Sequence, residues 1–457
     1  MSGYSKIGGK DMAELQWAPA ELRAAAAASS KAKERLTYLF DDGKYNELDA
    51  MAAGRELCGV ICAYGKVNGS PCYAFSQDVS RNLGALDFAQ AKKIARTLRL
   101  AGETGVPVVG IYDSCGADLN DGHKALIAYG ELLLKMSNLS GVVPQIAVIA
   151  GVCSGTSALL AESADITVIA EGAELYCTPG TEGSAGYAAK NGTAAIKAAD
   201  DKAAVEAAKA LLEKLPLNNL SPAPAFDFAA PSGISTVDMT LDGDSATELY
   251  ADFGKASYTA LASVEGTPVG VVSTDKAAKL TSDDCSKIAR FVRFCDSFSV
   301  PVITFVDTEG FEDDGAGAVK NMAKVAHAYA EATTAKISVV TGKAYGAAFI
   351  ALAGRGANAD ISFAVNTAKI TALAPDTAAE FFYHDELKGA ADAASKRKEL
   401  AERYVAEEGD PFAAAASGCA DEVISTAELR SALAAALEQL SSKRVSRRPK
   451  KHSNIQL

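Results

Sequence analysis

Two short segments carry the residue types best suited to chemistry. Residues 151–160 read GVCSGTSALL and residues 342–351 read GKAYGAAFIA. In each, an apolar strand pattern ends at glycine, and a helix pattern of small residues begins about four positions later. The start of a helix has unpaired N–H groups and the positive end of the helix dipole, and small residues let a ligand oxygen approach them. Both segments are therefore candidate oxyanion or enolate sites, and a tight strand–helix junction without a ligand is the alternative explanation.

The other reactive side chains lack a catalytic arrangement. Cys153 stands where a G-x-S-x-G nucleophile elbow needs its serine. His123, His327, His384 and His452 have neither triad nor metal-site spacing. His123 follows a polar loop and is better explained as the solvated start of a helix than as a base. These features favour chemistry performed by a bound cofactor and backbone dipoles, with no metal held by the chain.

A long internal repeat connects the two segments. Residues 93–116 read KIARTLRLAGETGVPVVGIYDSCG, and residues 287–310 read KIARFVRFCDSFSVPVITFVDTEG, a shift of 194 positions without a gap. Further along, PQIAVIAGVCSG (144–155) is echoed by AKISVVTGKAYG (335–346). Matches in the same order indicate a tandem duplication.

The duplication divides the chain into two predicted domains, 1–222 and 223–457. The stretch PLNNLSPAPAFDFAAPSG (216–233) is rich in Pro and Asn and is the natural linker. In each half, short apolar runs typical of strands buried on both faces alternate with helical patterns. This alternation predicts α/β domains with mainly parallel sheets and helical crossovers. Residues 1–30 are polar and then Ala-rich, and predict a helical arm.

Composition limits the class of protein. Of the 457 residues, 49% are hydrophobic, and 45 Lys and Arg face 57 Asp and Glu, a formal net charge of −12. This charge argues against a general nucleic-acid surface, which needs a basic footprint. The sequence has no run of 18 apolar residues, and we expect no signal peptide. Nine scattered cysteines fit a reducing compartment, so we expect a cytoplasmic globular protein.

Longer segments point to a family. They include YGKVNGSPCYAFSQD, YGELLLKMSNLSGVVPQIAVIAG, ARFVRFCDSFSVPVITFVD, YAEATTAKISVVTGKAYGAAF and the tail RRPKKHSNIQL. The chain resembles the β-subunit type of biotin-dependent acyl-CoA carboxyltransferase, as in propionyl-CoA carboxylase. It is also similar to the α-subunits of glutaconyl-CoA and methylmalonyl-CoA decarboxylases. The resemblance implies a tandem pair of crotonase-like (ClpP/crotonase) domains, often assembled as a hexamer, with the active site where the N-half of one subunit meets the C-half of another.

The resemblance also implies an activity. Such an enzyme moves a carboxyl group between biotin and the α-carbon of an acyl-CoA, within a carboxylase or a decarboxylase complex. The sequence has no Met-Lys-Met-type attachment site, so biotin would arrive on a separate biotin carboxyl carrier protein. The further partner would be a biotin carboxylase or a membrane decarboxylase subunit. The alternatives are a non-biotin crotonase-type acyl-CoA enzyme and a weakly catalytic structural paralogue.

By the same resemblance, the two glycine turns supply backbone donors to ligand oxygens. Gly155 and Thr156, in the domain on the acyl-CoA side, are expected to hold the thioester oxygen. Ala347 and Ala348, in the domain on the biotin side, are expected to hold the oxygen of biotin. Further ligand-binding residues are expected at Gly116, Ser154, Tyr345, Gly346 and Ile350.

The sequence departs from the family pattern at several of these places. Asp118 replaces an Arg, Glu309 a Pro and Ala347 a Gly, and residues 181–196 lack the usual Gly-Gly-Ala…His pattern. Ile350 stands where propionyl-type members tend to carry Asp, a position associated with acyl selection. The sequence therefore leaves open which acyl-CoA is used and in which direction the reaction runs.

Overall fold

Two compact units make up the chain. The computed structural model describes residues 6–7, 10–11, 30–52, 58–274, 278–312, 315–356, 359–445 and 448–454. The first unit comprises Met1–Ala188 and Lys197–Leu212, and the second comprises Ala189–Ile196 and Glu213–Leu457. Each unit holds one copy of the predicted repeat. Most of the predicted helical arm lies outside the described residues. Where it is described, the prediction is wrong, because β1 (Lys6–Ile7) and β2 (Lys10–Asp11) are short antiparallel strands.

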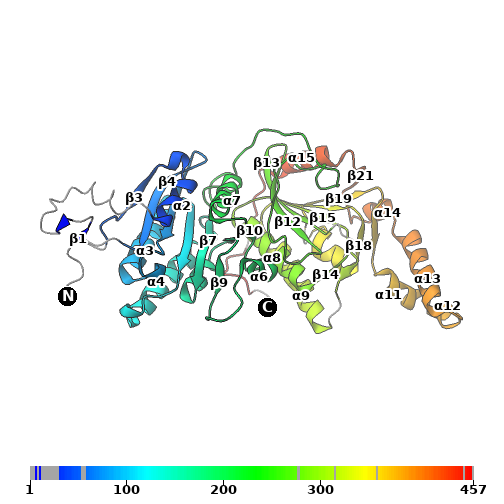
Figure 1. The fold of residues 1–457 in the computed structure, drawn as a ribbon. Helices are drawn as coiled ribbons and strands as arrows, with labels where there is room; N and C mark the ends of the chain where they lie inside the picture. Colours follow the sequence, from blue (N-terminus) through cyan, green and yellow to red (C-terminus); the bar gives the residue numbers. More distant parts are fainter. Residues whose placement is uncertain are drawn as a thin grey trace. The chain divides into compact units, whose positions relative to one another are not determined.

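The first unit is built around a mostly parallel sheet (Figure 1). From Lys31 to Lys214 the elements are α2 (Lys31–Leu39), η1 (Asp41–Gly43), β3 (Tyr45–Leu48), β4 (Val60–Val67), β5 (Ser70–Gln77), η2 (Asn82–Gly84), α3 (Phe88–Thr104), β6 (Val108–Ser114), η3 (Leu119–Asp121), α4 (His123–Leu139), β7 (Gln145–Ser154), α5 (Thr156–Ala161), β8 (Ile166–Ala170), β9 (Glu174–Tyr176), α6 (Ala185–Lys190), β10 (Ile196–Ala198) and α7 (Asp201–Lys214). The strand order is β10-β8-β7-β6-β5-β4-β3, and β9 pairs with β7. Strands β3, β4 and β5 are antiparallel, whereas β5 to β8 are parallel.

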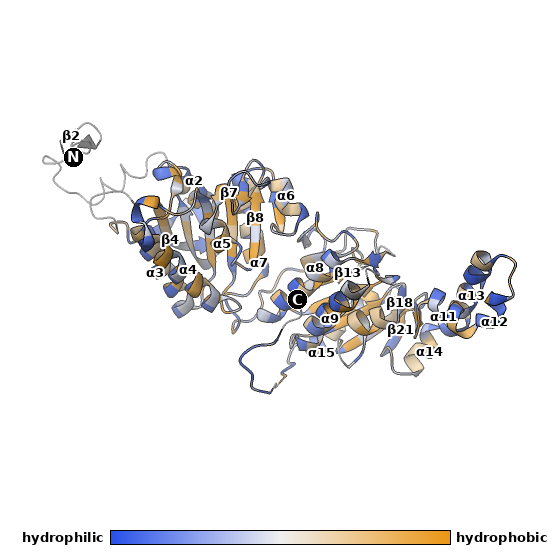
Figure 2. Cartoon of the chain, turned by 90° about the horizontal axis from the view of Figure 1, so that it is seen from below, coloured by the Kyte–Doolittle hydropathy of each residue, from blue (hydrophilic) through white to orange (hydrophobic). Residues whose placement is uncertain are grey.

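The sequence patterns explain these elements. The helix after Leu86 is α3: the Asp87 side chain accepts a hydrogen bond from the N–H of Gln90, and Gly105 ends the helix with φ 64°. Every residue of β6 is buried, which fits its unbroken apolar run. Figure 2 shows the strands of this sheet as predominantly hydrophobic. None of the described helices is both long and apolar enough to cross a membrane.

The second unit repeats the same sheet. Its elements are β11 (Thr247–Glu248), β12 (Tyr258–Val264), β13 (Thr267–Ser273), β14 (Lys279–Leu280), α8 (Ser282–Ser297), β15 (Val302–Val306), β16 (Gly310–Phe311), α9 (Ala316–Glu331), β17 (Lys336–Val340), β18 (Lys343–Tyr345), α10 (Gly346–Ala348), η4 (Phe349–Ala353), β19 (Ile361–Val365), β20 (Lys369–Thr371), α11 (Pro375–Phe382), α12 (His384–Lys388), α13 (Ala393–Glu408), α14 (Pro411–Ala416), β21 (Glu422–Ile424) and α15 (Leu429–Leu440). The strand order β11-β12-β13-β15-β17-β19-β21 matches that of the first unit, with antiparallel strands at one end and parallel strands after them. The predicted α/β duplication is confirmed.

The duplication extends to individual hydrogen bonds. In the first unit, the Gly116 N–H donates to Ser114 Oγ at 3.1 Å. In the second, the Gly310 N–H donates to Thr308 Oγ1 at 3.2 Å. These residues are equivalent in the repeat. In each unit, a hydroxyl side chain therefore accepts the hydrogen bond that closes the turn, after β6 in the first and after β15 in the second.

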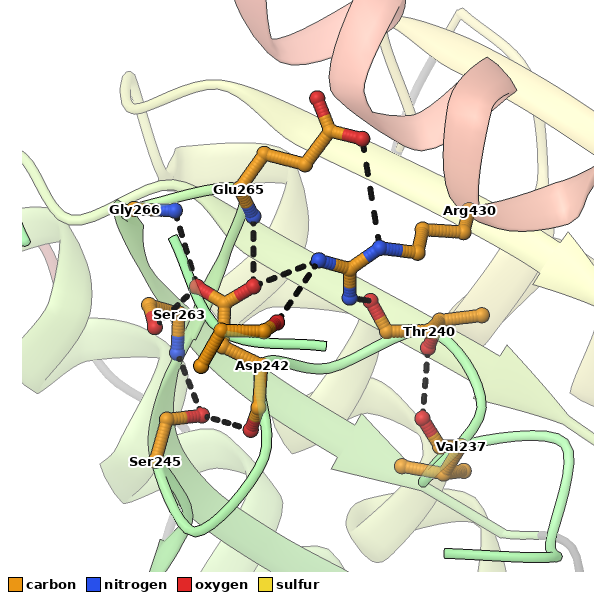
Figure 3. A network of polar contacts seen from close by, with 9 residues as sticks. Val237, Thr240, Asp242, Ser245, Ser263, Glu265, Gly266 and Arg430 are labelled. Carbon is orange, nitrogen blue, oxygen red and sulfur yellow. Dashed lines mark hydrogen bonds and ion pairs between the residues drawn. The ribbon is translucent and has the colours of Figure 1, made fainter. Parts of the chain in front are cut away.

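A buried ion pair joins the last helix of the second unit to its first segments (Figure 3). Arg430, on α15, places Nη2 2.7 Å from Asp242 Oδ1 and donates through Nη1 to the carbonyl of Thr240 at 2.9 Å. The Asp242 carboxylate also accepts hydrogen bonds from the Ser263 hydroxyl and the Gly266 N–H. The ion pair therefore fixes the segment before β11 against both the hairpin β12–β13 and the C-terminal helix.

The basic C-terminal tail is bound to its own unit. Lys443 Nζ lies 2.7 Å from Asp360 Oδ2 and 2.8 Å from the carbonyl of Thr334. Further on, Lys450 pairs with Glu331, at the end of α9. Lysines of the tail therefore neutralise carboxylates of the second unit.

Candidate functional site

The turn of the first unit follows β7 directly. This strand ends at Ser154, Gly155 adopts φ 59° and ψ −125°, and α5 begins at Thr156. Glycine is favoured here because side chains rarely adopt this conformation. The Gly155 N–H donates to the carbonyl of Tyr176 on β9 at 2.9 Å, and the Leu159 N–H donates to the carbonyl of Gly155. The Gly155 donor is thus engaged within the chain, and the Thr156 N–H is the first in the helix without a helical acceptor.

The loop after β6 lies against this turn. Strands β6 and β7 are parallel neighbours, and Ser114 pairs with Cys153 at their ends. Gly116 has φ 109°, and a Cβ there would lie 3.3 Å from the carbonyl oxygen of Ser154. Four of the predicted site residues of the first unit are thus brought together: Gly116, Ser154, Gly155 and Thr156.

Buried hydroxyls support the turn from beneath. Ser114 Oγ lies 3.0 Å from Ser157 Oγ, which lies 2.8 Å from the hydroxyl of Tyr129. Burial raises the pKa of Tyr129, although its hydrogen bond with Ser157 acts in the opposite direction. These neutral hydroxyls therefore position the two loops and do not form an acid–base pair.

Cys153 is not placed to act as a nucleophile. Its side chain is fully buried in the core, and burial raises the pKa of its thiol well above the usual value. The reactive form of cysteine is the thiolate, which this environment disfavours. The geometry agrees with the sequence in rejecting a hydrolase elbow here.

Close packing explains why the first residue of each motif, Gly151 or Gly342, is glycine. A Cβ on Gly151 would lie 2.3 Å from Asp113 Oδ1, and a Cβ on Gly342 would lie 2.3 Å from Asp307 Cγ. Asp113 and Asp307 are equivalent in the repeat, so each unit packs a carboxylate against the glycine of its own turn. These glycines are packing residues, whereas the later ones form the turns.

The turn of the second unit follows the short strand β18, which pairs with β20. Gly346 has φ 46°, and α10 leads without a break into η4, a π-helical turn. Such turns are rare in proteins, and those that occur are often found at functional sites. Tyr345 and Ala348 are buried, whereas Ala347 and Ile350 are exposed. Burial raises the pKa of Tyr345 despite the neighbouring positive charge of Lys343.

A cavity of about 380 Å³ opens beside this turn. Its lining comprises Gly346, Phe349, Ile350, Ile370, Thr371, Ala372, Tyr404, Glu408, Ala413, Ala414, Ser417 and Cys419. Two of the predicted site residues, Gly346 and Ile350, belong to this wall. The other lining residues, which include Tyr404, Glu408 and Cys419, could not be predicted from the repeat, because the first copy has only α6 between β9 and β10 where the second has α11 to α14 between β20 and β21.

Asp118 and Glu309, two residues that depart from the family pattern, each interact with a nearby group of this chain. Asp118 Oδ1 accepts a hydrogen bond from the Asn120 N–H at 2.9 Å and caps η3. Glu309 Oε1 lies 2.9 Å from Lys343 Nζ, and this contact raises the pKa of Lys343. The substituted charges are thus accommodated within the chain, one by a helix cap and the other by an exposed ion pair.

The fold and the two turns define a class: a duplicated α/β protein with one strand–glycine–helix turn in each half. Residues 25–455 match the model of the carboxyl transferase domain. The chain therefore belongs to the carboxyl transferase family, and the predicted membership is confirmed.

Named relatives are similar along nearly the whole chain. The methylmalonyl-CoA decarboxylase subunit alpha of Propionigenium modestum is 32% identical, covering 94% of both chains. The propionyl-CoA carboxylase carboxyltransferase subunit of Haloferax mediterranei is 32% identical, covering 93% of both chains. A solved structure of transcarboxylase 12S, a hexamer with methylmalonyl-CoA and methylmalonic acid bound, superimposes with a TM-score of 0.85 and 31% identity, covering 96% of this chain and 94% of that one. The predicted crotonase-like tandem fold and the predicted class of acyl-CoA carboxyltransferase components are confirmed.

Proposed function

We propose that this chain transfers a carboxyl group between biotin, carried by a separate biotin carboxyl carrier protein, and the α-carbon of a short acyl-CoA. The observation that carries the proposal is the pair of strand–glycine–helix turns, one in each unit. The relatives are named for both acyl-CoA carboxylation and decarboxylation, which supports a reversible transfer step and leaves both directions available. The partner is accordingly a biotin carboxylase or a membrane decarboxylase subunit.

The first unit would bind the acyl-CoA. Removing the α-proton or the carboxyl group places negative charge on the thioester oxygen. The Thr156 N–H, at the start of α5, would donate to that oxygen, while the loop at Gly116 and Ser154 forms the adjoining surface. Preorganised donors of this kind stabilise charge that develops in the transition state.

The second unit would bind biotin. A cavity of about 380 Å³ with mostly apolar walls is of the size that holds small ligands, and the bicyclic ring of biotin is small and neutral. When bound, biotin supplies a nitrogen that carries the carboxyl group. The exposed Ala347 and the neighbouring Ala348 would direct backbone N–H groups to its carbonyl oxygen. The exposed Ile350 would shape the entrance of the site, and the buried Tyr345 would support it.

Two further features belong to this proposal. The transcarboxylase 12S relative is a hexamer, and we assign the same kind of assembly to this chain. All nine cysteines lie in the described ranges and are free thiols, which supports a reducing, cytoplasmic location.

The test is a transfer assay with the purified chain, free biotin and methylmalonyl-CoA. We expect propionyl-CoA to form only when biotin is present, as followed by mass spectrometry. A parallel assay offers crotonyl-CoA and water without biotin. Hydration of crotonyl-CoA, combined with no biotin-dependent transfer on any short acyl-CoA, would establish the alternative of a non-biotin crotonase-type enzyme.

A further inference from the structure

A leucine in the first unit has an unfavourable backbone conformation. Asn82, Leu83 and Gly84 have φ angles of 45°, 53° and 71°, three left-handed residues in succession. Asn and Gly tolerate this region, whereas Leu does so at a cost. The Leu83 side chain is nevertheless 66% exposed, so burial of its apolar surface does not compensate. Folding alone gives no reason for leucine at this position.

Main-chain contacts explain the path of the loop but not the choice of leucine. The Cys115 N–H donates to the carbonyl of Leu83 at 3.1 Å, and the Gly84 N–H donates to that of Arg81 at 2.8 Å. A Cβ on Gly84 would lie 2.0 Å from the carbonyl oxygen of Asp113, so the loop and β6 approach closely. Asn or Gly at position 83 would make the same bonds with less strain.

The loop lies at the edge of the sheet that carries the turn. The Leu86 N–H donates to the carbonyl of Gly116 at 2.8 Å, and the Asp118 N–H donates to that of Leu86 at 3.0 Å. Gly116 in turn lies against Ser154. Hydrogen bonds and close packing therefore connect η2 to the carboxyl end of β7, and Leu83 is an exposed aliphatic side chain at this edge.

We infer that Leu83 is a binding residue that contacts the aliphatic part of the acyl-CoA, its acyl chain or its pantetheine arm. The inference rests on the function proposed above, which places the thioester at the neighbouring turn. Strained residues persist where the surrounding structure holds them and cluster at ligand sites. An apolar side chain held in solvent at the price of strain gains its apolar contact when such a ligand binds.

The decisive variant is Leu83→Asn, because its effects on stability and on binding are opposite. Asn suits the left-handed backbone, so the melting temperature should rise by about 2–4 °C. The loss of the apolar contact should raise the Kd for propionyl-CoA, measured by titration calorimetry, by about tenfold. In the transfer assay the KM for the acyl-CoA should rise while the KM for biotin stays unchanged. A merely structural residue would not separate the two constants.

Two variants serve as controls. Leu83→Met keeps the apolar contact and should bind propionyl-CoA as the parent does. Leu220 is 91% exposed and its backbone is not left-handed, so Leu220→Asn should change neither the melting temperature nor the Kd. Free CoA identifies the part that is contacted: a Kd raised equally for CoA and propionyl-CoA assigns the pantetheine arm, and a Kd raised only for propionyl-CoA assigns the acyl chain.

The outcomes for this inference and for the proposed function are distinct. A Leu83→Asn variant that binds propionyl-CoA as tightly as a binding-competent parent overturns the role of Leu83 alone. A parent that binds no acyl-CoA overturns the proposed function and this inference with it.

Discussion

The charge of Asp242 contributes to the fold through a buried ion pair with Arg430. Its carboxylate is buried and accepts hydrogen bonds from Ser263, Glu265, Gly266 and Arg430 (Figure 3). Removing one partner of a buried ion pair leaves the other charge uncompensated, at a cost of about 3–5 kcal/mol. We expect Asp242→Asn to lower the free energy of unfolding by this amount in urea titrations, because an amide NH₂ would also face the donors from Ser263 and Gly266.

Asp244 provides the matched control. It is exposed, two positions away, and has φ 58°, a conformation that Asn adopts readily. Asp244→Asn should therefore unfold at the same urea concentration as the parent. If both variants lose the same stability, the effect is a general response to lost negative charge and the ion pair is not its source.

The same residue predicts a dependence on pH. Burial alone would raise the pKa of Asp242, but the hydrogen bonds from Ser263, Gly266 and Arg430 outweigh burial and lower it. A carboxylate with a lowered pKa contributes stability above its unfolded pKa of about 3.9 and loses it as the pH falls through the folded value. The difference in unfolding free energy between parent and Asp242→Asn should be full at pH 7 and shrink below about pH 4.

At the scale of elements, the helix α5 offers a direct test of the backbone donor. Thr156 is its first residue, where proline is well tolerated because the N–H has no helical acceptor. Thr156→Pro removes that N–H and keeps the helix. Loss of one oxyanion donor reduces the rate about 10²–10³-fold, so kcat for carboxyl transfer should fall by this factor with an unchanged melting temperature.

Thr156→Ala is the control, because it keeps the N–H and removes only the side chain. It should retain the activity of the parent within a few-fold. Equal activity of folded Thr156→Pro and Thr156→Ala would show that this turn is a structural junction without a donor role.

The sequence located this turn but not the state of its donors. A strand–glycine–helix pattern predicts unpaired N–H groups, and it places Gly155 and Thr156 side by side. The pairing of β7 with β9 then uses the Gly155 N–H, because Ser154 lies opposite Tyr176. That register depends on a three-residue strand for which the sequence has no clear signal. A Gly155→Val variant would not test the donor role of this turn. Gly155 has a positive φ, so valine would distort the turn itself.

Among whole elements, the sheets could be predicted from the sequence, but the helices α11 to α14 could not. The repeat predicted matching sheets because the duplication preserved apolar runs and turns at a constant shift. The repeat gave little information about α11 to α14, which lie between β20 and β21, because the first copy has only α6 between the equivalent strands β9 and β10. The cavity beside Gly346 is closed by residues of this segment, such as Tyr404 and Ser417. Long-range closure of that kind depends on packing that no local pattern encodes.

At the scale of the whole molecule, helix α4 of the first unit has exposed apolar residues that another surface could cover. Helix α4 buries Ala125, Leu132 and Met136, yet Leu126 and Ile127 on its other side are each 66% exposed. Exposed apolar patches on globular proteins commonly mark interaction surfaces. The assembly proposed from the transcarboxylase relative would bury such a face against another copy of the chain.

The last prediction follows from this face. We expect light scattering of the parent to give a mass well above the 47.1 kDa of one chain. The double variant Leu126→Gln/Ile127→Gln keeps helix-forming residues but makes the face polar, so it should shift the mass toward the monomer and reduce transfer activity, with its secondary structure by circular dichroism unchanged. The control is Leu220→Gln/Ile234→Gln, which makes polar two residues that are 91% and 95% exposed outside any helix or strand. It should keep the parent's mass and activity, because these residues are exposed singly and no helix presents them as a face. A parent that is monomeric while active would contradict the assembly, and an unchanged mass of the α4 variant would show that the subunits meet elsewhere.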